Sequence, residues 1–174
     1  MDPTLYWIEN SSSRHLSISA RPRGGDWLDE EIEGLRKRGV DVVVSLLTPS
    51  ENEELNLKDE AGLSKAKGIR FFSFPIEDRG IPPSSAKVEQ LIAQLGSEVQ
   101  QGKTVVIHCR QGIGRSSLVS AALLIASGED IEQALRAISK ARGLEVPETV
   151  EQRKWLEQFA KNYVSTASLT RHSR

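Results

Sequence analysis

The chain has 174 residues, a length that suits one domain able to bury a core of its own. Its 23 Lys and Arg residues nearly balance its 24 Asp and Glu residues, and the formal net charge of −1 excludes the global positive field typical of nucleic-acid and membrane-surface binders. The single cysteine excludes an internal disulfide, and neither a signal peptide nor a long apolar run is evident. We therefore expect a cytoplasmic protein that binds neither nucleic acid nor membranes. The oligomeric state stays open.

Apolar runs in the first half of the chain predict strands that alternate with helices. Short strands are expected over residues 5–8 and 15–20, and Asp26 is positioned to cap a helix that ends before Gly39. A near-continuous apolar run over 40–47 is typical of a strand covered on both faces, which indicates a parallel sheet between helices. Residues 69–74 predict a second buried strand. Two short helices are expected between these strands, with Pro49 and Ser50 capping the first.

The second half of the chain continues this alternation. A helix is expected after Ser84, a strand from Val105, a buried helix over 118–126 and a further helix capped by Asp130. A final helix is expected after Pro147. Together these elements predict one α/β domain, with a mainly parallel sheet of about four or five strands and helices on both faces. A ligand should bind at the carboxyl ends of the strands.

The stretch 105–117 combines the features of an anion site. An apolar strand, a short loop and a helix present successive backbone N–H groups and a positive helix end to whatever lies in the loop. The same surroundings favour the thiolate form of Cys109, while Gly112 and Gly114 let the backbone approach a ligand closely. Five residues after the cysteine, the Arg115 guanidinium can bind two phosphate oxygens at once, which lysine cannot do. These features predict nucleophilic attack on phosphorus.

The sequence His108-Cys109-x5-Arg115-Ser116 resembles the signature of the cysteine-dependent protein tyrosine and dual-specificity phosphatases. This resemblance covers residues 20–160. It implies a phosphatase-like catalytic domain over 1–164, followed by a short polar basic tail over 165–174. We expect His108 to anchor the loop by hydrogen bonding and Ser116 to stabilise the departing thiolate. The expected phosphate-binding residues follow the cysteine in the loop: Arg110, Gln111, Gly112, Ile113, Gly114 and Arg115.

A second loop, over residues 75–83, offers a proton donor for the leaving group. Departure of an alkoxide or phenolate at neutral pH needs such a donor, which is typically worth about 10² to 10⁴ in rate. Glu77 and Asp78 follow a predicted strand, so they should lie at the same sheet edge as Cys109. The resemblance implies that the acid loop precedes the signature by a few tens of residues. That pattern selects Asp78 as general acid, with Glu77 in reserve.

The predicted mechanism has two steps. Cys109 attacks phosphorus while Asp78 protonates the leaving oxygen, and the phosphocysteine is then hydrolysed by water that loses a proton to Asp78. In some relatives a glutamine near the C-terminus orients this water, which makes Gln152 a further candidate; an exposed helix glutamine is the alternative. No metal or other cofactor is expected, because the three histidines lie far apart in the sequence.

The expected substrate is a phosphorylated protein, with phosphotyrosine esters first and phosphoserine or phosphothreonine esters as further candidates. Some relatives that act on inositol lipids carry two lysines in the loop, whereas this chain has Arg110 and Ile113 at those places. A phosphatase for phosphoinositides or other small phosphoesters nevertheless stays open. Two further alternatives are a rhodanese-type sulfurtransferase, whose loop is usually one residue shorter, and a phosphate-binding module without activity.

Overall fold

The computed structural model describes residues 2–9 and 15–171, with side chains described as far as residue 163. Its sheet has five strands in the order β1-β2-β5-β3-β4. Their bounds are β1 (Tyr6–Trp7), β2 (Leu16–Ser19), β3 (Val42–Ser45), β4 (Arg70–Ser73) and β5 (Val105–His108). β1 pairs antiparallel with β2, and every other pair of neighbours is parallel. The expected single α/β domain with a mainly parallel sheet is confirmed.

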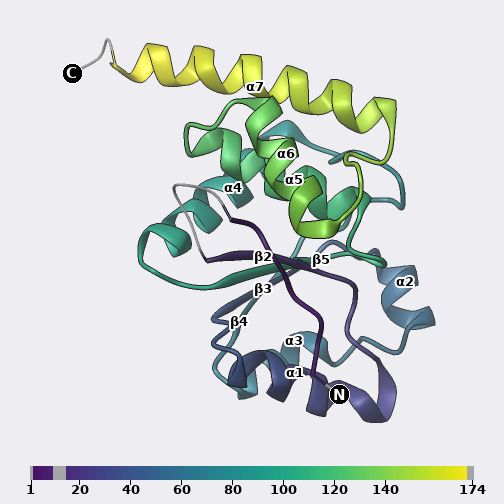
Figure 1. The fold of residues 1–174 in the computed structure, drawn as a ribbon. Helices are drawn as coiled ribbons and strands as arrows, with labels where there is room; N and C mark the ends of the chain where they lie inside the picture. Colours follow the sequence, from purple (N-terminus) through teal and green to yellow (C-terminus); the bar gives the residue numbers. More distant parts are fainter. Residues whose placement is uncertain (1, 10–14, 172–174) are drawn as a thin grey trace.

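Helices cover both faces of this sheet (Figure 1). On one face lie α1 (Leu28–Lys37), which follows the short 3-10 turn η1 (Gly25–Trp27), and α3 (Glu60–Ala66). On the other face lie α4 (Ser85–Gln100), α5 (Gly114–Ala126) and α6 (Ile131–Arg142). The long α7 (Val150–Arg171) packs on α5 and α6, and α2 (Pro49–Glu54) follows β3 at the end of the sheet.

The central strands send alternate side chains into two hydrophobic cores. Val42 and Val44 of β3 belong to the core under α4–α7, whereas Val43 belongs to the core under α1 and α3. β5 shows the same division, with Ile107 in the first core and Val106 in the second. Successive side chains of a strand point to opposite faces, so a strand buried on both faces needs an unbroken apolar run. This packing explains the composition of residues 40–47.

The helix that follows β5 is buried on every side. All residues of α5 from Gly114 to Ile125 are buried, because the helix lies between the sheet and the three helices α4, α6 and α7. An apolar surface all round is typical of such a helix. The loop between β5 and α5 is therefore attached at both ends to rigid, buried elements.

Two local expectations are wrong. β4 is an edge strand with only β3 beside it, so Arg70 and Ser73 are exposed and Phe71 and Phe72 are half-buried. Asp26 does not cap α1, because it lies inside η1 and the residue at the cap position is Trp27, whose side chain makes no capping hydrogen bond.

The C-terminal helix α7 continues past position 165 to Arg171, whereas residues 172–174 lie outside the described part of the chain. The boundary between a domain over 1–164 and a tail over 165–174 stays a prediction. Across residues 2–9 and 15–171, no helix combines the length and the apolar character needed to cross a bilayer.

Candidate active site

The carboxyl ends of four strands lie in one row. Ser45 of β3 pairs with Ser73 of β4 and with His108 of β5, which also pairs with Ser19 of β2. The loops that follow these residues therefore meet at one edge of the sheet, where parallel α/β sheets bind their ligands. They include the loop 109–113 and the acid loop 74–84.

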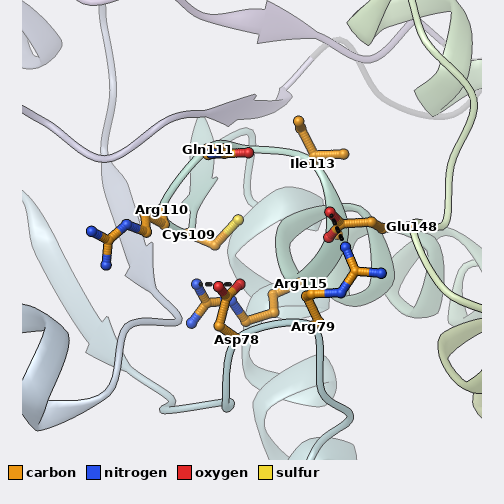
Figure 2. Close-up of a pocket in the computed structure, with 9 residues that line it drawn as sticks. Asp78, Arg79, Cys109, Arg110, Gln111, Ile113, Arg115 and Glu148 are labelled. Atoms are coloured by element: carbon orange, nitrogen blue, oxygen red, sulfur yellow. Dashed lines mark hydrogen bonds and ion pairs between the residues drawn. The ribbon is translucent and has the colours of Figure 1, made fainter.

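A cavity of about 260 Å³ opens at this edge (Figure 2). It brings together Cys109, Arg115 and Asp78, which come from different parts of the chain. Of the other candidates, Glu77, His108, Gly112, Ser116 and Gln152 do not line it. The residues that do are Asp78, Arg79, Cys109, Arg110, Gln111, Ile113, Gly114, Arg115 and Glu148.

The loop after β5 holds the cysteine at the start of α5. Cys109 Sγ lies 3.3 Å from the Ser116 hydroxyl, within hydrogen-bonding distance for sulfur. The loop needs glycine at position 112, where φ is +69° and a Cβ atom would lie 2.6 Å from the carbonyl oxygen of Ser19. Arg142 Nε, from the end of α6, donates a hydrogen bond of 2.6 Å to the Gly112 carbonyl. The conformation of this loop thus depends on residues from β2 and α6.

The Arg115 side chain is only 2% exposed, and hydrogen bonds hold its guanidinium at the cavity. Its two terminal nitrogens donate hydrogen bonds to the two Glu51 carboxylate oxygens at 2.7 and 2.9 Å. Nη1 also donates to the Ile76 carbonyl at 2.8 Å, and Nη2 lies 3.3 Å from Asp78 Oδ1. A paired, planar guanidinium of this kind presents its remaining edge to a phosphate in one fixed orientation.

Glu51 is itself fixed by the start of α2. Its backbone N–H donates to the Thr48 hydroxyl at 3.3 Å, and its carboxylate accepts from the Thr48 N–H at 3.0 Å, which completes a capping box. Thr48, and not Pro49 or Ser50, is therefore the cap. Burial alone would raise the pKa of Glu51, but the hydrogen bonds and charge of Arg115 together with the hydrogen bonds from Thr48 outweigh burial and hold this pKa below its ordinary value of 4.5.

Glu51 was not among the site residues predicted from the sequence. The Thr48-x-x-Glu51 spacing is a recognisable signal for a capping box, but no local signal indicates the ion pair with Arg115. The pair stabilises the charge of both partners. Although burial by itself would lower the pKa of Arg115, its hydrogen bonds with Glu51 and the nearby charges of Cys109, Glu51 and Asp78 together keep that pKa above the ordinary arginine value.

Replacing Glu51 with glutamine should destabilise the fold in a pH-dependent way. Glutamine also completes a capping box, but the Arg115 charge loses its carboxylate, so we expect the free energy of unfolding at neutral pH to fall by about 3 kcal/mol. The lowered pKa of Glu51 makes its contribution fully present above pH 4.5 and lost as the pH falls through the folded-state pKa. Denaturant unfolding from neutral pH down to about pH 3 should therefore show the two proteins converging.

The matched control is Glu53→Gln, because Glu53 lies on the same helix in an exposed ion pair with Lys58. This substitution should change the free energy of unfolding by less than about 1 kcal/mol at every pH. A stability difference for Glu51→Gln that does not change between neutral and acidic pH would contradict the assigned ion pair.

Two further side chains of the signature loop are held by acidic residues from distant segments. His108 Nε2 lies 2.7 Å from Glu60 Oε1, and both side chains are 2% exposed. Arg110 makes two hydrogen bonds with Glu54, at 2.8 and 3.3 Å, and its guanidinium points away from Cys109 (Figure 2). The Arg110 side chain is therefore held by Glu54 and is not directed at the sulfur.

The acid loop places its two carboxylates differently. Asp78 lines the cavity and faces Arg115, whereas Glu77 is exposed and lies outside the cavity lining. Arg79, the next residue of the loop, forms an ion pair with Glu148 at 3.0 Å. Glu148 is a cavity residue that no feature of the sequence had indicated.

The alternative that Gln152 is an exposed helix glutamine is wrong, and Gln152 does not line the cavity either. Its role in orienting the hydrolytic water stays a prediction. Its side chain is fully buried next to the start of α7. The amide nitrogen donates to the Gly80 carbonyl at 3.1 Å, and the amide oxygen accepts from the Thr149 N–H at 3.2 Å. Reciprocal bonding with Thr149 turns Gln152 inward against the acid loop. Within residues 2–9 and 15–171, no group of three His, Cys, Asp or Glu side chains is arranged to hold a metal ion.

Comparison of this chain with known proteins identifies its family. A match to the family Tc-R-P, described as a polymorphic toxin system DSP-PTPase phosphatase, covers residues 19–129, more than half of the chain. The chain belongs to the DSP-PTPase family. The resemblance of the signature to tyrosine and dual-specificity phosphatases is thereby confirmed.

Similar proteins agree with membership of the DSP-PTPase family. Cyclin-dependent kinase inhibitor 3 of Rattus norvegicus is 28% identical over 134 residues, which cover 76% of this chain and 63% of that protein. Protein tyrosine phosphatase type IVA 3 of Bos taurus is 32% identical over 117 residues, which cover 66% of this chain and 62% of that protein. The chain thus spans less than two thirds of the length of these two relatives.

A solved structure shows that the DSP-PTPase member described here also shares its fold with a known phosphatase. The crystal structure of kinase associated phosphatase, in which the catalytic cysteine is replaced by serine, superimposes with a TM-score of 0.81 at 23% identity. The match covers 94% of this chain and 97% of that one.

Proposed function

We propose that this chain is a metal-independent phosphatase that hydrolyses phosphotyrosine esters of proteins, with phosphoserine and phosphothreonine esters as further substrates. One observation carries the proposal: a thiol, a buried and oriented guanidinium and a carboxylate face one cavity at the carboxyl edge of the sheet. Family membership favours this activity over a sulfurtransferase or a phosphate-binding module without activity.

In the first proposed step the Cys109 thiolate attacks phosphorus. The S–P bond forms as the P–O bond to the leaving group breaks, and Asp78 donates its proton to the leaving oxygen. The Arg115 guanidinium and the N–H groups of residues 110–115 bind the three non-reacting oxygens. Positioning and electrostatic stabilisation of this kind supply most of the catalysis in phosphoryl transfer.

In the second proposed step water hydrolyses the phosphocysteine. The Asp78 carboxylate takes a proton from the attacking water, the S–P bond breaks and inorganic phosphate leaves. The Ser116 hydroxyl, 3.3 Å from the sulfur, is placed to donate a hydrogen bond to the thiolate that departs. Each group thereby returns to the protonation state in which the cycle began.

Substrate choice is tested by comparing rates on matched phosphoesters. We expect kcat/KM to be highest for a phosphotyrosine peptide, lower for the same peptide with phosphothreonine, and lowest for inositol phosphates, because the loop carries no lysine between Cys109 and Arg115. Vanadate should inhibit, and chelators should leave the rates unchanged. A preference for inositol phosphates would favour the phosphoinositide alternative, and a metal requirement would contradict the mechanism. A cytoplasmic location is part of the proposal.

A further inference from the structure

Two hydrogen bonds attach the tip of the acid loop to the start of α7. Both are made by the residues that come directly after Asp78. Arg79 Nη1 donates to Glu148 Oε1 at 3.0 Å, and Gln152 Nε2 donates to the Gly80 carbonyl at 3.1 Å. Figure 2 shows the Arg79–Glu148 contact among the residues that line the cavity. The loop that carries the Asp78 carboxylate is therefore held by the start of α7, which lies far from it in the sequence.

The attachment on the α7 side is rigid. The Gln152 side chain is fully buried, and its amide oxygen accepts from the Thr149 N–H, while the Thr149 hydroxyl accepts from the Gln152 N–H at 3.1 Å. The Thr149 N–H, by binding the amide oxygen, directs the amide nitrogen at Gly80. Glu148 lies against the start of α5, where a Cβ atom on Gly114 would come within 2.5 Å of its Oε2.

The attachment on the loop side depends on a tight turn. The Gly80 N–H donates to the Glu77 carbonyl at 2.8 Å, and Arg79 adopts a left-handed backbone conformation with φ of 60°. This turn presents the Arg79 side chain and the Gly80 carbonyl to α7. The Asp78 side chain is 63% exposed, so packing does not hold it, and an ion pair of 3.3 Å joins it to Arg115 across the cavity.

We propose that Glu148 and Gln152 are positioning residues that hold Asp78 over the cavity, where it can reach the leaving oxygen. This inference rests on the proposed function. It assigns Gln152 a role in the first chemical step, through the acid loop, in place of orienting the water of the second step. Both polar ends of the Gln152 amide are engaged by backbone groups, which supports this assignment.

The test compares two substrates that differ in their need for a general acid. p-Nitrophenolate leaves readily without a proton, whereas the leaving group of phenyl phosphate needs one. In Gln152→Glu the carboxylate still accepts from Thr149, but it cannot donate to Gly80. We expect kcat/KM, which reports the step in which the leaving group departs, to fall at least about tenfold more for phenyl phosphate than for p-nitrophenyl phosphate, with a weakened basic limb in the pH profile. Glu148→Ala should act in the same direction with a smaller effect, because its ion pair is partly exposed.

Two control variants separate positioning from stability. Thr149→Ala removes the hydroxyl that accepts from the Gln152 N–H but keeps the Thr149 N–H that holds the Gln152 side chain, so it should lower Tm without changing the ratio of the two rates. Glu151→Ala removes an exposed carboxylate from the same helix and should change neither quantity. Because Glu148 lies at the cavity mouth, its variant keeps the proposal testable even where Gln152→Glu fails to fold.

Three results are decisive. Equal losses on the two substrates in both variants would overturn the proposal. A burst of p-nitrophenol followed by slow turnover in Gln152→Glu, without such a burst in Asp78→Asn, would also overturn it, because that pattern assigns Gln152 to hydrolysis of the phosphocysteine independently of Asp78. Failure of the unaltered protein to hydrolyse either substrate would overturn the proposed function itself, so the two failures are distinguishable.

Discussion

Replacing Cys109 with serine is expected to abolish hydrolysis of p-nitrophenyl phosphate while leaving oxyanion binding intact. An alcohol is not ionised at neutral pH, and neither the start of α5 nor the Arg115 guanidinium can make it an adequate nucleophile. Loss of a nucleophile typically lowers kcat by a factor on the order of 10⁴ or more. The Arg115–Glu51 pair and the loop N–H groups do not depend on the sulfur, so the anion site should survive.

Turnover and binding have to be measured on the same preparation. Steady-state kinetics gives kcat, and calorimetric titration with phosphate or vanadate gives the affinity of the anion site. Ser97→Ala, on the far helix α4, serves as a control for handling and folding. Unchanged turnover in Cys109→Ser would contradict the assignment of the nucleophile. Loss of anion binding together with turnover would instead indicate a collapsed loop.

Replacing Asp78 with asparagine should lower kcat for phenyl phosphate, whose leaving group needs a proton, by about 10² to 10⁴. The shape of the pH profile should change as well. A general acid has to be protonated, so the rate of the unaltered protein should fall as the pH rises through the titration of this group. An amide does not titrate in this range, and the basic limb should therefore disappear. The exposed ion pair with Arg115 adds little stability, so the unfolding free energy should change by less than about 1 kcal/mol.

The matched control is Glu77→Gln, which removes one negative charge from the same loop at an exposed position outside the cavity lining. Its pH profile should keep the basic limb, and its kcat should stay close to that of the unaltered protein. A lost basic limb in Glu77→Gln, with the limb retained in Asp78→Asn, would show that the general acid is Glu77.

Contiguous features of the chain were sufficient to predict the strand, loop and helix around Cys109. The apolar run into β5, the two glycines of the loop and the apolar stretch of α5 lie within about twenty residues, and each acts on its own neighbours. The caps at Ser84 and Asp130 were predictable for the same reason, because each side chain accepts a hydrogen bond from the backbone three residues later. The covered strand β3 was likewise evident from its own composition.

The partners of the site residues were not predictable in this way. Arg115 pairs with Glu51 and His108 pairs with Glu60, across 64 and 48 positions of the chain. The segment before β4 holds several acidic residues, and no local pattern separates the two that are buried from those that face water. The inward position of Gln152 and the edge position of β4 depend equally on which elements lie beside them.

The sequence by itself therefore determined the alternation of strands and helices, the anion-binding loop and the choice of nucleophile, because hydrophobic period and turn chemistry act between near neighbours. Only the tertiary structure decided that Glu51 orients the Arg115 guanidinium and that Glu60 contacts His108. It also decided that the start of α7 holds the acid loop. The strand order sets those pairings by bringing particular loops to one edge of the sheet, and a side chain has no preference for a distant partner until that edge is assembled.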